Sequence, residues 1–146
     1  MHGHDHPLVA GSNLNIGEVY RNQGDFEKAL FQYQKALDVY LTVYGQDHLD
    51  TAGSYESIGI LHGRQGQYHD AANLLEKALN IKEEVVGFRH PEVARSHVNL
   101  AWLQAKQGAV AECKHYLDLA LETSFLHHYV SFLESEADLS NVRALE

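Results

Sequence analysis

Small and apolar residues recur along this chain at a fixed interval of 42 positions. Aligning residues 3–44 with residues 45–86 without a gap gives 15 identities in 42 positions, and a third copy follows at the same interval. An internal repeat of this length is typical of stacked structural units. The clearest columns of equivalent residues are Gly17, Gly59 and Ala101; Gly24, Gly66 and Gly108; Ala29, Ala71 and Cys113; Ala36, Ala78 and Ala120; and Leu37, Leu79 and Leu121.

Each unit has the hydrophobic spacing of two helices. Apolar and small residues recur three and four positions apart, which is typical of one buried helix face. We expect a first helix at about 8–22, 50–64 and 92–106, and a second helix that begins near residues 26, 68 and 110. The second-helix stripe comprises Ala29, Leu30, Tyr33, Ala36, Leu37 and Tyr44 in the first unit, and Ala71, Leu75, Ala78, Leu79 and Val86 in the second.

The residues around these helices fit the same interpretation. Gly24 and its equivalents end the first helix, because a tight helix end favours a backbone conformation that glycine adopts easily. Pro7 and Pro91 fall in the first turn of a helix, where a missing N–H costs nothing. The small residue at Gly17 predicts a close crossing of the two helices. A histidine precedes the first helix of each unit in a cap or pre-cap position: His6, His48 and His90.

The second unit resembles the tetratricopeptide repeat, through Ile58-Gly59, Gln65-Gly66-Gln67-Tyr68, Ala71 and Ala78-Leu79. The usual period of that family is 34 residues. A 42-residue version, with an extended second helix and a G-x-x-H-P-x-V-A connector, is similar to the repeats of kinesin light chains. The resemblance covers residues 3 to about 123. It implies an all-α fold, a right-handed superhelix of three helix-turn-helix repeats with a C-terminal capping helical segment.

The repeat predicts one domain over residues 1–146, with units at about 3–44, 45–86 and 87–128 and a capping segment at about 124–146. That last segment contains no Gly or Pro, and Val142 and Leu145 fall in register with Leu100 and Leu103. We interpret it as a prolonged last helix followed by a degenerate first helix of a fourth unit, which would cover that end of the stack. The first helix of the chain has no such cover, which indicates either a longer array or self-association there.

The resemblance implies a concave groove along the first helices, in which similar proteins bind extended or short helical peptides. Asn15 and Asn99 match positions where such repeats often carry an asparagine that bonds the backbone of a bound peptide. An amide donates and accepts hydrogen bonds at once, which suits main chain. Mapping by register places these residues on the groove: Asn15, Glu18, Arg21 and Asn22; Ser57, Ile60 and Arg64; and Arg95, Asn99, Trp102 and Lys106.

Trp102 is the foremost candidate for a binding anchor, because large aromatic side chains dominate the energetics of interfaces. The alternative is that Trp102 packs against the terminal helix. A clamp for a terminal carboxylate, as some similar proteins have, is disfavoured. Leu14, Glu18 and Ser57 stand where much of its basic and amide set would lie, and Glu18 would repel the carboxylate.

The charge balance narrows the class of partner. The chain carries 20 acidic against 11 basic residues, a formal charge of −9, whereas nucleic-acid binding needs clustered Lys and Arg. No apolar run approaches the roughly 18–20 residues of a membrane span. Cys113 is the only cysteine, so an oxidising compartment is not indicated and a cytoplasmic setting is expected. We therefore expect a protein or peptide partner, and neither nucleic acid nor a membrane.

Eleven histidines raise the question of a metal site. His2, His4 and His6 alternate, and His127 and His128 are adjacent, whereas a zinc site needs three or four converging ligands. The glycines are isolated, unlike those of a phosphate-binding loop.

We expect no metal, no cofactor and no enzymatic activity. The predicted function is a protein-interaction scaffold; the alternatives are a structural or regulatory spacer of a larger signalling or scaffold protein, a self-association module, or a metal-dependent function centred on the histidines.

Overall fold

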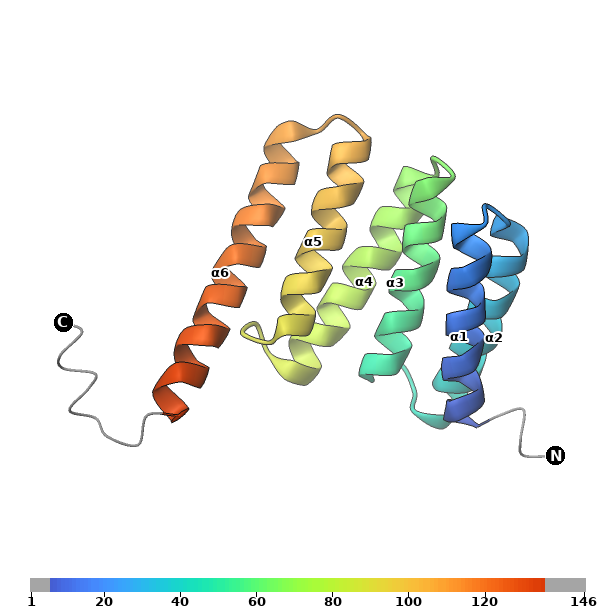
Figure 1. Ribbon diagram of the computed structural model, residues 1–146, viewed down its shortest axis with the longest axis horizontal. Helices are drawn as coiled ribbons and strands as arrows, with labels where there is room; N and C mark the ends of the chain where they lie inside the picture. The colour runs from blue at the N-terminus through green and yellow to red at the C-terminus, as the bar shows by residue number, and fades with distance from the viewer. Residues whose placement is uncertain (1–5, 136–146) are drawn as a thin grey trace.

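The computed structural model describes residues 6–135, with side chains as far as residue 124. Within this range the chain forms six helices and no strand: α1 (Pro7–Asn22), α2 (Phe26–Val43), α3 (Leu49–Arg64), α4 (Tyr68–Val86), α5 (Pro91–Lys106) and α6 (Val110–Ser135). They pair into three helical hairpins that stand in one row, with α1 and α2 at one end and α6 at the other (Figure 1). The all-α fold expected from the repeat is confirmed.

A histidine cap begins the first helix of every hairpin. Nδ1 of His6 accepts a hydrogen bond from the N–H of Leu8 at 3.0 Å. His48 and His90 accept in the same way from the N–H groups two residues further on, at 3.0 and 3.1 Å. The first turn of a helix leaves its N–H groups without intrahelical partners, so each imidazole stabilises a helix start. The predicted cap position of the three histidines is confirmed.

Glycine sets the close packing within each hairpin. Gly24, Gly66 and Gly108 lie in the three turns with φ of 80°, 81° and 75°, where other residues are strained. At Gly17, an added Cβ atom would lie 2.6 Å from the ring of Tyr33, which is far closer than two carbon atoms pack. The predicted helix crossing at Gly17 is therefore confirmed.

The core lies between hairpins as well as within them. One cluster joins α2 to α3, and another joins α4 to α5. A single hairpin cannot bury its apolar face alone, so stacking closes the core. The buried residues of these joints are Tyr33, Leu37, Ile58 and Leu61 in the first, and Leu75, Leu100 and Leu103 in the second.

Tyr44 lies outside this core, although the sequence pattern placed it in the second-helix stripe. It is the C-cap residue of α2 and is 40% exposed. Its ring stacks on the imidazole of His48, with the centroids 3.9 Å apart. The N–H of Tyr44 still donates to the carbonyl of Tyr40, but α2 ends at Val43, and the Tyr44 ring packs on the N-cap histidine of α3 and not in the core.

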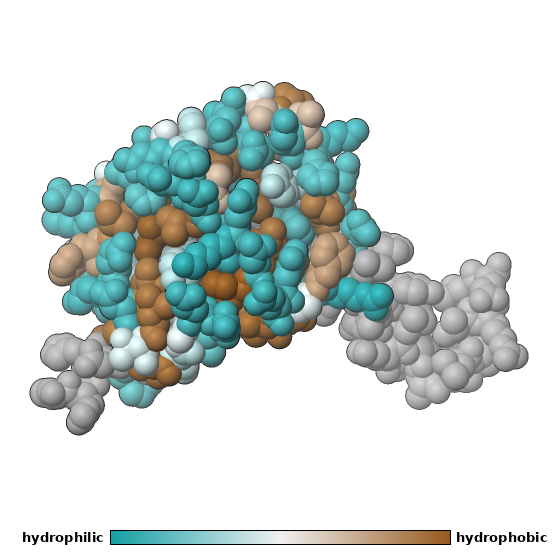
Figure 2. Space-filling model, turned by 180° about the vertical axis from the view of Figure 1, so that it is seen from behind, coloured by the Kyte–Doolittle hydropathy of each residue, from teal (hydrophilic) through white to brown (hydrophobic). Residues whose placement is uncertain are grey.

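The last helix, α6, extends to Ser135 and is longer than α2 and α4. The first helix expected for a fourth unit falls outside the described residues. Among the helices described, none combines the length and the apolar character needed to cross a bilayer. Seen from behind, the surface is mostly hydrophilic, and an apolar strip interrupts it at the end of the stack that carries α1 and α2 (Figure 2).

Candidate partner-binding groove

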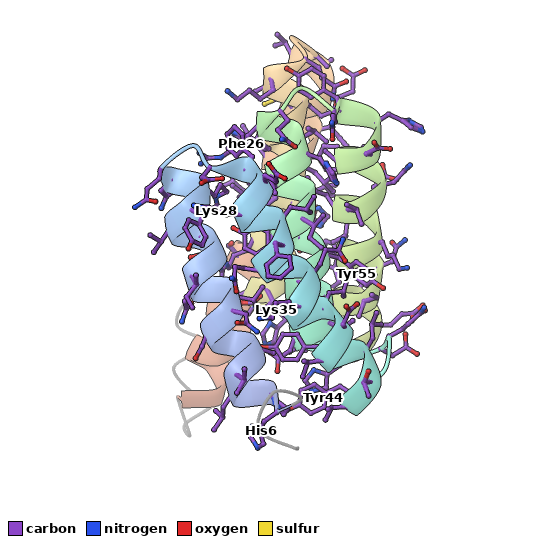
Figure 3. All side chains as sticks on the ribbon, turned by 90° about the vertical axis from the view of Figure 1, so that its right-hand side faces the viewer. His6, Phe26, Lys28, Lys35, Tyr44 and Tyr55 are labelled. Carbon is purple, nitrogen blue, oxygen red and sulfur yellow. The ribbon has the colours of Figure 1, made fainter. Side chains whose placement is uncertain are left out.

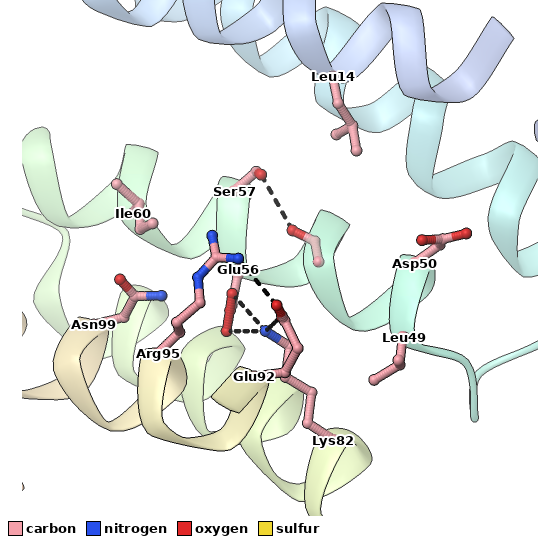
Figure 4. Close-up of a pocket in the computed structure, with 11 residues that line it drawn as sticks. Leu14, Leu49, Asp50, Glu56, Ser57, Ile60, Lys82, Glu92, Arg95 and Asn99 are labelled. Carbon is pink, nitrogen blue, oxygen red and sulfur yellow. Dashed lines mark hydrogen bonds and ion pairs between the residues drawn. The ribbon is translucent and has the colours of Figure 1, made fainter. Parts of the chain in front are cut away.

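An open hollow of about 500 Å³ lies at the middle of the stack, and we call it the central groove. Leu14 reaches it from α1 and Lys82 from α4, whereas the rest of its lining comes from α3 and α5 (Figure 4). Stacking thus brings residues of three repeat units to one site. The complete lining is Leu14, Leu49, Asp50, Gly53, Glu56, Ser57, Ile60, Lys82, Glu92, Arg95 and Asn99.

A buried ion-pair network forms the floor of the central groove. Nζ of Lys82 lies 2.9 Å from Oε1 and 2.8 Å from Oε2 of Glu56, and 3.1 Å from Oε2 of Glu92. The Lys82 side chain is only 2% exposed. A buried ammonium group is tolerated when charged partners and hydrogen bonds replace its water. Two carboxylates do so here, and they tie α4 to both α3 and α5.

Glu92 connects this floor to the rim of the groove. Its Oε1 accepts a hydrogen bond from Nη1 of Arg95 at 3.0 Å, while its Oε2 faces Lys82. Partial burial by itself raises the pKa of Glu92, but the hydrogen bonds and charges of Lys82 and Arg95 outweigh burial and hold the pKa below its ordinary value. The ionised carboxylate therefore anchors the exposed Arg95 side chain beside the groove.

The remaining lining mixes apolar and neutral polar groups. Leu14, Leu49 and Ile60 supply apolar surface, and Ser57 and Asn99 supply polar groups. Ser96 of α5 also holds the floor in place, because its hydroxyl donates a hydrogen bond to the Glu56 carboxylate. A concave surface with apolar walls and a few placed polar groups is typical of a binding site.

A family model of the tetratricopeptide repeat matches residues 8–84, and a second model of the same repeat matches residues 57–112. The first match covers more than half of the chain. This chain belongs to the tetratricopeptide-repeat family. No curated protein gives a significant match to it.

Solved structures share the arrangement of this tetratricopeptide-repeat chain. BtubC (BKLC) from P. vanneervenii superposes with a TM-score of 0.73 at 21% identity, over 82% of this chain and 48% of that one. A kinesin light chain candidate from Podosopora anserina with nearly identical TPR-like repeats superposes with a TM-score of 0.71 at 20% identity, over 81% of this chain and 56% of that one. The chain thus spans about half the length of these structures. At such identities the likeness shows the fold, and it confirms the predicted helical solenoid.

The equivalent positions of the tetratricopeptide units predict that eleven residues line a groove. The structure brings four of these eleven residues together. Ser57, Ile60, Arg95 and Asn99 line the central groove. The other seven lie elsewhere on the first helices, most of them exposed: Asn15, Glu18, Arg21, Asn22, Arg64, Trp102 and Lys106. Asn22, Arg64 and Lys106 are the last residues of α1, α3 and α5, so they lie at the turn end of the hairpins and do not line the hollow.

Trp102 joins two tetratricopeptide units. A Cβ atom added to Gly63 of α3 would lie 2.8 Å from the Trp102 ring, which also packs against the cluster that contains Leu100 and Leu103. Nζ of Lys106 lies 5.9 Å from the centroid of the Trp102 ring. Trp102 is therefore half-buried between α5 and α3.

Sequence reasoning missed the ion-pair network, although the tetratricopeptide columns carry a signal for it. Glu56 occupies a column that is apolar in both other units, and Lys82 a column that is uncharged in both. Two opposite charges that occur only in the middle unit, in columns that otherwise carry no charge, indicate a pair. Its existence depends on α3 and α4 lying side by side, which the repeat already predicts.

The described residues contain no group of three or more His, Cys, Asp or Glu side chains that could hold a metal ion. The side chains of His2, His4, His127 and His128 lie outside that part of the chain. His6, His48 and His90 use Nδ1 for helix capping and stand one tetratricopeptide unit apart.

Proposed function

We propose that this chain is a protein-interaction scaffold that binds a peptide or protein segment in the central groove. One observation carries the proposal: residues of three repeat units converge on an open hollow whose charged floor is already paired. A partner would meet a fixed surface and would not have to reorganise it, which favours affinity because less freedom is lost on binding.

The lining offers contacts to both the side chains and the main chain of a peptide. Leu14, Leu49 and Ile60 offer apolar surface to side chains. The amide of Asn99 can donate to a main-chain carbonyl and accept from a main-chain N–H. Arg95 gives one N–H to Glu92 and has further donors for a partner.

The predicted residues beyond the hollow fit a longer partner. The half-buried Trp102 and the exposed Lys106 continue the site along α5, and Asn15 and Glu18 continue it along α1. A segment that extends out of the central groove would reach these side chains next. We propose them as secondary contacts.

Family membership supports a role without catalysis, because tetratricopeptide repeats are in general interaction modules. We propose that the chain performs no chemistry, needs no cofactor and acts on protein partners in the cytoplasm. The formal charge of −9 weighs against a nucleic-acid partner.

The double variant Arg95→Ala/Asn99→Ala tests the groove. Both residues line the hollow and neither belongs to a buried cluster, so the helices should remain intact by circular dichroism. In a pull-down from the source organism's lysate, the proteins captured by the wild type should be depleted at least about tenfold, equivalent to about 1.4 kcal/mol of binding free energy.

The matched control is Asn80→Ala/Arg89→Ala, which removes the same two residue types from exposed positions outside the groove. It should capture the same proteins as the wild type. Equal capture by the groove variant and this control would rule out the central groove as the binding site.

A structural spacer within a larger protein or assembly is the second candidate. It is favoured by the exposure of Ile16 and Val19 on the outer side of α1 and by the chain spanning about half the length of the solved structures it matches. A spacer would keep its partners in the groove variant and lose them when Ile16 and Val19 are replaced by glutamate.

A further inference from the structure

The joints between hairpins use the same four repeat columns each time. Two columns belong to the second helix of one unit and two to the first helix of the next. Their buried side chains pack together in clusters that span the joint. In the α2–α3 joint, Tyr33 and Leu37 face Ile58 and Leu61. In the α4–α5 joint, Leu75 and the half-buried Leu79 face Leu100 and Leu103.

The same columns are exposed at the two ends of the stack. On α1, Ile16 and Val19 are 45% and 55% exposed, whereas their equivalents in α3 and α5 are at most 3% exposed. On α6, Leu117 and Leu121 are 44% and 69% exposed. Each end thus presents one half of the joint that holds the hairpins together.

Among the described residues, only α6 is a second helix without a first helix packed on its outer side, and only α1 is a first helix without a preceding second helix. Seen from the N-terminal end, α1 and α2 form the front of the stack with no described helix before them (Figure 3). Within this part of the chain, no second helix packs on the outer side of α1, and the exposed columns of α6 are those that pack on a first helix at the internal joints.

We propose that copies of this chain associate head to tail, with Leu117 and Leu121 of one copy packed on Ile16 and Val19 of the next. The joint repeats the α2–α3 and α4–α5 packing and continues the solenoid from one molecule into the next. The two surfaces are different, so the contact is heterologous and each new copy offers a free end for another.

Two columns that carry charges at the α4–α5 joint carry uncharged residues at the two ends of the stack, which agrees with this pairing. Across the α4–α5 joint, Lys82 donates to Glu92 at 3.1 Å, in addition to its contacts with Glu56. At the ends of the chain, the same columns hold Ser124 on α6 and Leu8 on α1. Packing one end on the other therefore buries no unpaired charge at these positions, which would otherwise oppose association.

Light scattering over a concentration series that reaches about 1 mM tests the joint, because even weak contacts are populated there. We expect the weight-average mass to rise from the monomer value of 16.4 kDa to beyond that of a dimer. The variants Ile16→Glu/Val19→Glu and Leu117→Glu/Leu121→Glu should each remain at the monomer mass. Mixed in equal amounts, they should form a complex of twice that mass and grow no further, because the mixture retains only one compatible pair of faces.

The variant Phe31→Glu is the matched control. Phe31 is 62% exposed on α2 and lies outside the four joint columns, so its replacement should leave association at the wild-type level. The groove variant Arg95→Ala/Asn99→Ala should also associate normally, which separates this inference from the proposed function. These variants change side chains that are exposed or, for Asn99, half-buried, and they should keep the wild-type helical content.

Two results would overturn the proposal. The first is a wild type that stays at the monomer mass throughout the series. The second is association of Leu117→Glu/Leu121→Glu by itself, which indicates that two α1 faces pair symmetrically. If the wild type stays monomeric, the variant Val142→Glu/Leu145→Glu gives the reason, because these residues share the columns of Ile16 and Val19: its association would assign the α6 face to the chain's own C-terminal segment.

Discussion

Lys82 and Glu56 form an ion pair with 2.8 Å between Nζ and Oε2, and both side chains are almost completely closed to solvent. They belong to the two helices of the middle hairpin, and Glu92 links the same ammonium group to the next hairpin. A buried pair of this kind contributes little compared with an apolar pair, but separating its members is costly. The central groove therefore has a floor whose geometry depends on electrostatics.

Replacing Lys82 should destabilise the fold far more than replacing an exposed lysine. Lys82→Met leaves Glu56 close to Glu92 without the cation that both contact, and we expect the free energy of unfolding in urea to fall by about 3–5 kcal/mol. Lys114→Met on the exposed side of α6 should change it by less than about 0.5 kcal/mol. Similar losses for the two variants would contradict the role assigned to the network.

The contribution of Glu92 to stability should disappear in acid. Its pKa in the folded protein lies below the ordinary value of 4.5 because of Lys82 and Arg95, although burial opposes the shift. A lowered pKa means that the unfolded chain binds the proton first as the pH falls, so the contribution is complete above pH 4.5 and is lost below it. The difference in unfolding free energy between wild type and Glu92→Gln should therefore shrink from pH 6 towards about pH 3. Glu112→Gln, at an exposed position on α6, should show no comparable trend.

Mild acid should weaken the fold through His97. Burial, and secondarily the nearby His115, lower the pKa of His97 below its ordinary value of 6.5, and its ring lies between the rings of Phe88 and Tyr116. The unfolded chain therefore takes up a proton near pH 6.5 that the folded protein binds only at lower pH. The stability that depends on a neutral His97 is therefore fully present above pH 6.5, and it is lost as the pH falls below that value.

The variant His97→Leu should remove that pH dependence. Both ring nitrogens of His97 are buried without a hydrogen-bond partner among the described residues, so an apolar side chain of similar size should raise the unfolding free energy by about 1 kcal/mol at pH 7. The gain should be larger at pH 5.5. Urea unfolding at several pH values measures it, and a constant difference between the two proteins would exclude His97 as the titrating group.

Two glycines in the first helices should respond in opposite ways to alanine. Gly17→Ala places a Cβ atom 2.6 Å from the Tyr33 ring, and we expect a loss of about 1–3 kcal/mol from overpacking. Gly53→Ala meets nothing within 4 Å, so helix propensity should stabilise the protein by up to about 1 kcal/mol. Thermal unfolding gives the melting temperature of each variant, and a shift of the same sign for both would refute the close crossing at Gly17.

Much of the fold could be predicted because its determinants are local and repeat along the sequence. The cap histidines, the turn glycines and the close contact at Gly17 each depend on residues within one hairpin. Tyr44 shows where prediction from the local pattern fails, because the apolar stripe continues in the sequence past the point where α2 ends. Trp102 shows another, since its packing partner Gly63 belongs to a different unit.

The candidate site was predicted only in part. Asn15, Ser57 and Asn99 occupy equivalent positions in three units, but only Ser57 and Asn99 line the central groove. Register identifies equivalent positions, whereas a hollow requires that helices from different units face one another. The middle unit has neighbours on both sides, so the hollow forms there.

The sequence by itself determined the unit, its helices, its turns and the family, because a 42-residue period and residues that act over short distances specify a hairpin. Tertiary structure alone decided that Lys82 reaches two carboxylates, that these eleven residues line the central groove, and that the exposed apolar columns of α1 match those exposed on α6. Those features arise from contacts between helices of different units, and their geometry depends on how closely successive hairpins pack.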